Sequence, residues 1–137
     1  MLGDKVTESR GKVTSQRYLP GDDYRYIKME ITIEEQGTIL GQQGMNMGTY
    51  TAWERVPGQI YATGQGLIAT MDGEDAIWTG HGVGHMTGDA GAISFRFSIA
   101  FQAGGTGKLA ALNNCLVVGE HEVSASGETQ TTGWEWK

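Results

Sequence analysis

Residues 92–103 read AISFRFSIAFQA, the clearest alternation of apolar and polar side chains in the chain. Isoleucine and phenylalanine occupy the odd-numbered positions from 93 to 101, and serine, arginine, alanine and glutamine occupy the even-numbered ones. Because successive side chains of a strand point to opposite faces, the pattern predicts a strand with one buried face. We expect Phe95, Phe97 and Ile99 in the core and Arg96 on the opposite face.

Similar extended runs lie on both sides of this strand. In residues 26–35, Ile31 and Ile33 alternate with polar residues, which puts Lys28 and Glu30 on the opposite face. Residues 108–113 are rich in helix formers but too few for more than one helical turn. The predicted strands number about eight: Lys12–Leu19, Tyr26–Glu35, Gly48–Val56, Gln59–Thr70, the run after Asp75, Ala92–Ala103, Cys115–Ser124 and Thr129–Trp136.

The dipeptide Asp72-Gly73 lies between two long extended runs and is a strong hairpin signal. A turn of this kind requires a positive φ, so we expect Gly73 in the left-handed region. If these two residues form the whole loop, the register of the hairpin follows. The predicted pairs are Met71 with Glu74, Leu67 with Trp78, Gly64 with His81, and Ile60 with His85.

About eight antiparallel strands with one apolar face each must close into a barrel or split into two packed sheets, because an open sheet leaves its apolar face in water. The chain has 22 glycines in 137 residues. Many lie inside strand-like runs, where glycine permits the bends of a closed barrel. We therefore predict an all-β fold, with residues 1–137 forming one antiparallel barrel domain. At this strand number the interior is filled or holds one small ligand.

The formal net charge of −6 disfavours a nucleic-acid partner or an anionic membrane surface. No stretch is apolar enough for a membrane helix, and the N-terminus lacks the apolar run of a secretory signal. Cys115 is the only cysteine, so it cannot form a disulfide within the chain. These features favour a cytoplasmic protein with no membrane partner.

Seven short motifs stand out along the chain: Gly64–Gly66, Met71–Glu74, Trp78–Gly84, Ser94–Arg96, Lys108–Ala110, Glu120–Val123 and Trp134–Lys137. Together they resemble a family of short, uncharacterised bacterial and archaeal proteins, over roughly residues 26–137. The barrel of that family resembles the barrel of the allene oxide cyclases and, more remotely, that of the dirigent proteins. The resemblance implies architecture only, because no motif residue of the cyclases aligns with this sequence.

The candidate catalytic residues are four glutamates: Glu35, Glu54, Glu120 and Glu122. Glu35 continues the apolar face of its strand, but we favour a strand that ends or bulges near Gly37 and leaves Glu35 solvated. Buried without a partner, it would instead act as a general acid or base. Glu120 and Glu122 share one face of their strand and His121 lies on the other. Apolarity does not decide which face is inside. Glu54 likewise lies on the opposite face from its neighbour Arg55.

The candidate ligand-binding residues are aromatic: Trp53, Trp78, Phe95, Phe97 and Phe101. Such side chains line apolar cavities, although an ordinary core is the alternative. His81 and His85 lie four residues apart on one strand, a separation of about 13 Å, and cannot bind one ion, so no metal site is expected. No nucleotide-binding or hydrolase motif has its required context, and no cofactor is expected.

Two functional classes remain open from the sequence. The first is a non-catalytic barrel that binds a small apolar molecule in its lumen or assembles with copies of itself. The second is a cofactor-free cyclase or isomerase that uses a buried carboxylate. Trp134 and Trp136 share one face of the last strand, and an outward orientation of that face would predict a homo-oligomer. A lumenal cavity of a few hundred Å³ with a carboxylate in its wall would favour a ligand.

Overall fold

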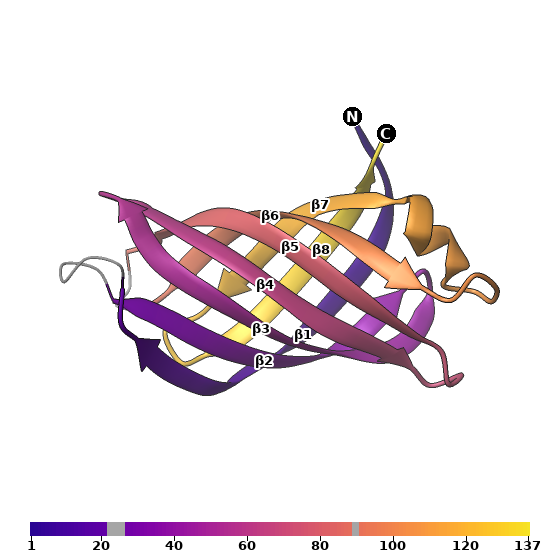
Figure 1. Ribbon diagram of the computed structural model, residues 1–137, viewed down its shortest axis with the longest axis horizontal. Helices are drawn as coiled ribbons and strands as arrows, with labels where there is room; N and C mark the ends of the chain where they lie inside the picture. The colour runs from indigo at the N-terminus through magenta and orange to yellow at the C-terminus, as the bar shows by residue number, and fades with distance from the viewer. Residues whose placement is uncertain (22–26, 89–90) are drawn as a thin grey trace.

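The computed structural model describes residues 1–21, 27–88 and 91–137. Eight antiparallel strands form a closed barrel in which each strand pairs with its neighbours in sequence and β1 pairs with β8 (Figure 1). The all-β barrel predicted from the alternating runs is confirmed. The strands are β1 (Leu2–Leu19), β2 (Lys28–Ile39), β3 (Gln42–Val56), β4 (Gln59–Thr70), β5 (Asp75–Met86), β6 (Ile93–Ala103), β7 (Leu116–Val123) and β8 (Glu128–Trp136).

Several strands are longer than the sequence pattern predicted. β1 begins at Leu2, whereas the pattern placed its start at Lys12. The pattern missed the first part of the strand because the inward side chains there include Thr7 and Ser9, which break the apolar alternation. Tyr26, the predicted start of the next strand, lies outside the described residues. One 3-10 turn, η1 (Ala110–Asn114), falls in the predicted helical segment. Within the described ranges, no helix has the length and apolar character needed to cross a bilayer.

The register predicted for the hairpin of β4 and β5 is wrong by one residue. Trp78 pairs with Gly66 instead of Leu67, and the other predicted pairs shift equally. The Thr70 N–H donates to the Glu74 carbonyl at 2.8 Å, so the loop holds three residues and not two. Gly73 has φ 88°, which confirms its predicted left-handed conformation.

This register places glycine opposite glycine. Gly64 pairs with Gly80, and both belong to the inner face of the barrel. In the predicted register Gly64 would instead have faced His81. Because neither glycine carries a side chain, neighbouring side chains approach the backbone closely: a Cβ added at Gly64 would lie 2.6 Å from Tyr50 Cβ, and one added at Gly80 would overlap Ile99 Cγ2.

The orientation of the predicted core residues is confirmed. The five expected inside are buried or are partly buried and packed against the core: Ile31, Ile33, Phe95, Phe97 and Ile99. Arg96 is exposed, and Lys28 and Glu30 are half-buried on the opposite faces of their strands. Alternation along a single strand therefore sufficed to orient these side chains.

The core is divided into two clusters along the barrel. The first contains Val6, Ile39, Ile68, Ala76, Phe101, Leu109, Leu112 and Val117. The second contains Ile31, Ile33, Tyr50, Ala52, Ala62, Phe95 and Val123. Both clusters contribute side chains to the cavity described below.

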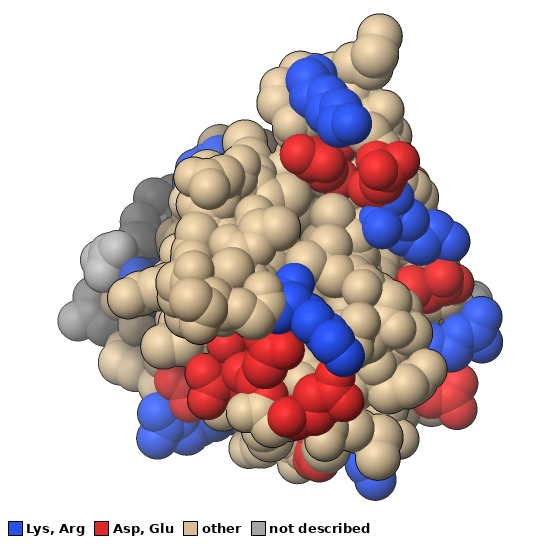
Figure 2. Space-filling model, turned by 90° about the vertical axis from the view of Figure 1, so that its right-hand side faces the viewer, with Lys and Arg blue, Asp and Glu red and all other residues tan. Residues whose placement is uncertain are grey.

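The segment around η1 closes one end of the barrel. Leu109 and Leu112 are only 1% exposed and belong to the first cluster. The Glu74 carboxylate accepts hydrogen bonds from the backbone N–H groups of Lys108 and Leu109 at 3.2 and 3.1 Å. The Lys108 ammonium contacts Asp72 at 2.7 Å. Figure 2 views this end and shows a mainly uncharged surface crossed by a basic side chain beside acidic ones.

Candidate functional site

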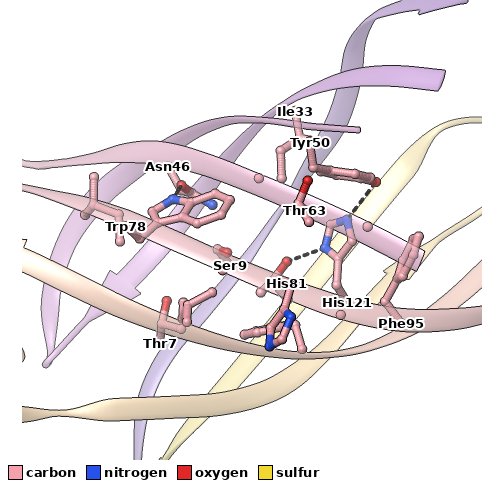
Figure 3. Close-up of a pocket in the computed structure, with 18 of the residues that line it drawn as sticks. Thr7, Ser9, Ile33, Asn46, Tyr50, Thr63, Trp78, His81, Phe95 and His121 are labelled. Atoms are coloured by element: carbon pink, nitrogen blue, oxygen red, sulfur yellow. Dashed lines mark hydrogen bonds between the residues drawn. The ribbon is translucent and has the colours of Figure 1, made fainter. Parts of the chain in front are cut away.

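A cavity of about 90 Å³ lies in the lumen of the barrel (Figure 3). Its apolar lining comes mainly from β2, β5 and β6: Ile33, Trp78, Phe95, Phe97, Ile99 and Phe101. Its polar lining comes mainly from β1, β3, β7 and β8: Thr7, Ser9, Asn46, Tyr50, His121 and Thr131. The cavity is thus apolar with a polar side, and smaller than the few hundred Å³ of typical ligand pockets.

Glycines create the space on the apolar side. Gly64 and Gly80 line the cavity with backbone alone, and the outward-facing Thr63 and His81 complete the lining there. Two further glycines lie against the Trp78 indole: a Cβ added at Gly48 or Gly66 would come within 2.5 Å of the ring. The indole therefore occupies space that strand side chains would otherwise fill.

Glu35 of β2 is completely buried behind the polar side of the cavity, with 0% exposure. Its carboxylate accepts hydrogen bonds from the Thr129 hydroxyl at 2.7 Å, the Thr131 hydroxyl at 2.8 Å and the Ser9 hydroxyl at 3.0 Å. The Asn46 amide donates a fourth bond at 3.3 Å. Four strands thus supply the donors and the acceptor, which compensates the cost of burying the charge.

The orientation of the Asn46 amide is fixed by Trp78. The indole N–H can only donate, and it lies 2.8 Å from the Asn46 oxygen. The Asn46 nitrogen is therefore the atom that faces Glu35. This bond connects the aromatic side of the cavity to the carboxylate.

His121 of β7 lies between Glu35 and the cavity. Its Nδ1 is 2.7 Å from the Thr131 hydroxyl, and its Nε2 is 3.3 Å from the Tyr50 hydroxyl (Figure 3). Burial lowers the pKa of His121, and the nearby Glu35 and Glu122 carboxylates offset this only in part. Burial, followed by the Glu35 charge, raises the pKa of Tyr50. Both rings are therefore neutral at pH 7.

The structure brings some of the predicted site residues together. Glu35, Trp78, Phe95, Phe97 and Phe101 all lie in or directly behind the lining of the cavity. The solvated strand end favoured for Glu35 is wrong, because β2 continues to Ile39 and keeps the carboxylate inside. The carboxylate is also not buried without a partner, since four groups donate to it. On β7 it is His121 that faces inward.

The other predicted site residues do not line the cavity. Glu54 is exposed near the end of β3. Glu120 and Glu122 lie 3.8 and 3.2 Å from the Arg96 guanidinium. Trp53 packs edge-on against Tyr61, with ring centroids 5.1 Å apart, and does not line the lumen. Strand parity separates Trp53, Glu120 and Glu122 from the cavity, whereas Glu54 shares the inward parity of Tyr50 and Ala52 and is exposed because it lies at the end of its strand.

Sequence reasoning missed several polar members of the site: Ser9, Asn46, Tyr50, Thr129 and Thr131. Tyr50 has the same strand parity as the buried Ala52, which was a usable signal. Thr129 and Thr131 gave none, because threonine is common on both faces of strands. Among the described residues, no three His, Cys, Asp or Glu side chains gather as a metal site would require.

Trp134 and Trp136 lie on the face of β8 opposite the inward-facing Thr129 and Thr131. Trp134 is half-buried, and Trp136 is 55% exposed. Trp134 lines a groove on the outer surface together with Tyr61 and Val118. The two indoles therefore belong to the exterior of the barrel.

Comparison with solved structures shows the fold to be shared by bacterial proteins. A protein of unknown function from Clostridium acetobutylicum ATCC 824 has a TM-score of 0.81 at 15% identity, covering 98% of each chain. A beta-barrel like protein from Acinetobacter baumannii AYE has a TM-score of 0.81 at 14% identity, covering 100% of this chain and 96% of that one. A conserved protein of unknown function from Rhodopseudomonas palustris has a TM-score of 0.76 at 16% identity, covering 99% of each.

At these identities the likeness shows the fold alone. None of the three proteins is described as an allene oxide cyclase or a dirigent protein, so that resemblance stays an expectation. No protein-family model matches the chain. No curated protein matches it either.

Proposed function

We propose that the barrel binds one compact, mostly apolar molecule in its lumen. The supporting observation is the cavity itself, whose aromatic and aliphatic walls leave polar atoms on one side only. An apolar pocket with a few convergent polar groups is the usual form of a small-molecule site. Tyr50 and His121 are the polar groups available to orient a ligand.

The size of the cavity limits the ligand. A volume of about 90 Å³ holds more than one water molecule but less than a drug-sized compound. The ligand we expect is a small ring or short chain with one polar end. The apolar part would lie against Phe97 and Ile99, and the polar end near His121.

NMR titration tests this proposal. Cyclopentanone and benzene are added separately to the protein, and the indole N–H signal of Trp78 is followed, because that group lies at the cavity and is fixed by Asn46. We expect the shift to saturate at a lower concentration with cyclopentanone than with benzene, since only the ketone carries a polar end.

A matched pair of variants controls the titration. Ala62→Leu fills part of the cavity and should abolish the saturable shift, whereas Ala100→Leu on the exposed face of β6 should preserve it. A shift that is unaffected by Ala62→Leu would place the ligand outside the lumen and contradict the proposal.

A second candidate function is a cofactor-free isomerase. The observation that favours it is the connection of the buried Glu35 to His121, which itself lines the cavity. A binding protein releases its ligand unchanged, whereas an isomerase exchanges hydrogen between the ligand and solvent. Hydrogen exchange in the ligand therefore distinguishes the two functions.

A further inference from the structure

We infer that His121, and not the buried carboxylate, exchanges a proton with the molecule in the cavity, because Glu35 and Thr131 hold its imidazole with Nδ1 protonated and Nε2 unprotonated. The inference rests on the proposed lumenal binding site. It makes Nε2 of His121 the base, and it makes Glu35 and Thr131 positioning residues.

The direction of each hydrogen bond gives the tautomer. All the groups that contact Glu35 are donors, as suits an ionised carboxylate. A threonine hydroxyl has one hydrogen, and that of Thr131 is used on Glu35. The 2.7 Å contact between Thr131 and His121 therefore requires that Nδ1 carry the donated hydrogen. In a neutral imidazole, Nε2 is then the acceptor, and the Tyr50 hydroxyl donates to it.

Glu35 itself is in the wrong place to act on a ligand. It has no exposed surface, its oxygens are occupied by four donors, and it is not among the residues that line the cavity. A base must reach the proton it removes, directly or through one water. The carboxylate instead stabilises the imidazolium that forms on His121, whose Nδ1 lies 4.0 Å from it.

The chemistry that suits this arrangement is proton transfer at the carbon next to a carbonyl. The Tyr50 hydroxyl first turns from Nε2 to the carbonyl oxygen of the ligand, which frees the Nε2 lone pair; Nε2 then removes a proton from the carbon, and the C–H bonding pair becomes the C=C bond of an enolate whose oxygen Tyr50 stabilises. Return of the proton from Nε2–H to the same or a conjugated carbon restores the carbonyl. No electrons are gained or lost, so the step needs no oxidant. The ligand class is a small ketone or enone.

Nitrogen-15 NMR of the histidine side chains tests the tautomer directly. We expect His121 to show Nδ1 protonated and Nε2 unprotonated in the folded protein at pH 7. Thr131→Val removes the acceptor for Nδ1–H and should shift the population toward the Nε2–H form. Thr132→Val, on the opposite face of β8, should not. An Nε2–H signal in the unmutated protein would overturn the inference.

Hydrogen exchange tests the chemistry. Cyclopentanone is incubated with the protein in D₂O, and deuterium uptake at its α carbons is compared with uptake in buffer alone. We expect faster uptake with the protein, a loss of about 100-fold in His121→Gln, and a smaller loss in Thr131→Val. Urea unfolding shows whether each variant is folded. If His121→Gln does not fold, Tyr50→Phe is tested in its place.

The outcomes separate this inference from the proposed function. If cyclopentanone shifts the Trp78 signal but takes up no excess deuterium, the site binds without acting as a base and the inference is wrong. If cyclopentanone does not bind, the proposed lumenal function fails and the inference fails with it. Uptake that persists unchanged in His121→Gln would assign the base elsewhere.

Discussion

The lumen has two unlike walls. On β3, β4 and β5 the inward positions include Gly48, Gly64, Gly66 and Gly80, and the Trp78 ring covers part of the bare backbone. On β1 and β8 the inward positions carry hydroxyl groups that surround the Glu35 carboxylate of β2. We call these the glycine wall and the hydroxyl wall. One supplies space and the other supplies polar groups.

The two walls depend on opposite kinds of contact. Among the described residues, every buried side-chain nitrogen or oxygen has a hydrogen-bond partner. The hydroxyl wall therefore loses stability when a polar group is removed. The glycine wall is already in contact with aromatic rings, so it loses stability when an atom is added.

The largest effect should come from removing the charge in the hydroxyl wall. Glu35→Gln keeps the shape but turns an amide group toward donors, and we expect it to lower the free energy of unfolding by about 3 kcal/mol. Glu122→Gln, on the outside, should change it by less than about 0.5 kcal/mol. Urea unfolding measures both, and equal losses would contradict the contrast between buried and exposed carboxylates.

The glycine wall should respond to a single added methyl group. In Gly66→Ala the new Cβ would overlap the Trp78 indole, and we expect a loss of about 2 kcal/mol. Gly105→Ala is the matched control, because a Cβ there meets nothing within 4 Å. Thermal unfolding of the two variants compares them. A neutral Gly66→Ala would mean that the ring can move aside.

The pH dependence of stability should report His121. Its folded-state pKa is lowered, so below about pH 6.5 the unfolded chain binds a proton that the folded chain does not. Stability is thus complete above that pH. As the pH falls it is lost, by about 1.4 kcal/mol per pH unit, until His121 protonates in the folded state.

Unfolding in urea at pH 7.0, 6.0 and 5.5 measures this slope. His121→Gln should flatten it, whereas His85→Gln, which removes an exposed imidazole on β5, should leave it unchanged. Glu35, Glu122 and Tyr50 are the titratable groups that act on or contact His121. A slope that survives in His121→Gln would assign the proton to another group.

The smallest effect should come from removing one donor of four. Ser9→Ala leaves Glu35 with three hydrogen-bond donors, and we expect a loss of about 1 kcal/mol. Ser98→Ala on the outer face of β6 provides the comparison. If Ser9→Ala costs as much as Glu35→Gln, the hydroxyl wall acts as one unit and not as separate bonds.

The sequence predicted the apolar lining contributed by β6 and little of the hydroxyl wall. Apolar alternation oriented Phe95, Phe97 and Ile99 correctly, because burial of apolar surface decides which way a strand faces. The same rule could not find Ser9 or Thr131, since a hydroxyl group is as common on a solvent-exposed strand face as on a buried one. Their inward position depends on Glu35, which is distant from both in sequence.

The hairpin register shows a second limit. Asp72-Gly73 marked the turn correctly, but the loop contains one more residue than predicted, and two- and three-residue loops share this signal. The error moved Trp78 from Gly66 to Leu67, and so concealed the close contact between the indole and the glycine wall. A one-residue error in register is enough to hide a cavity.

The pairing of β1 with β8 has a consequence for folding kinetics. All other pairs join neighbours in sequence, whereas this one brings Leu2 opposite Trp136, so its loop-closure entropy is the largest in the molecule. We expect it to form last. Ser9 and Thr131 lie on the two strands that meet there, so the Glu35 carboxylate sheds its water only as the barrel closes. The late barrier would then contain the dehydration of a single charge, and the uncharged variants Glu35→Gln and Glu35→Leu would both fold faster than the unmutated protein.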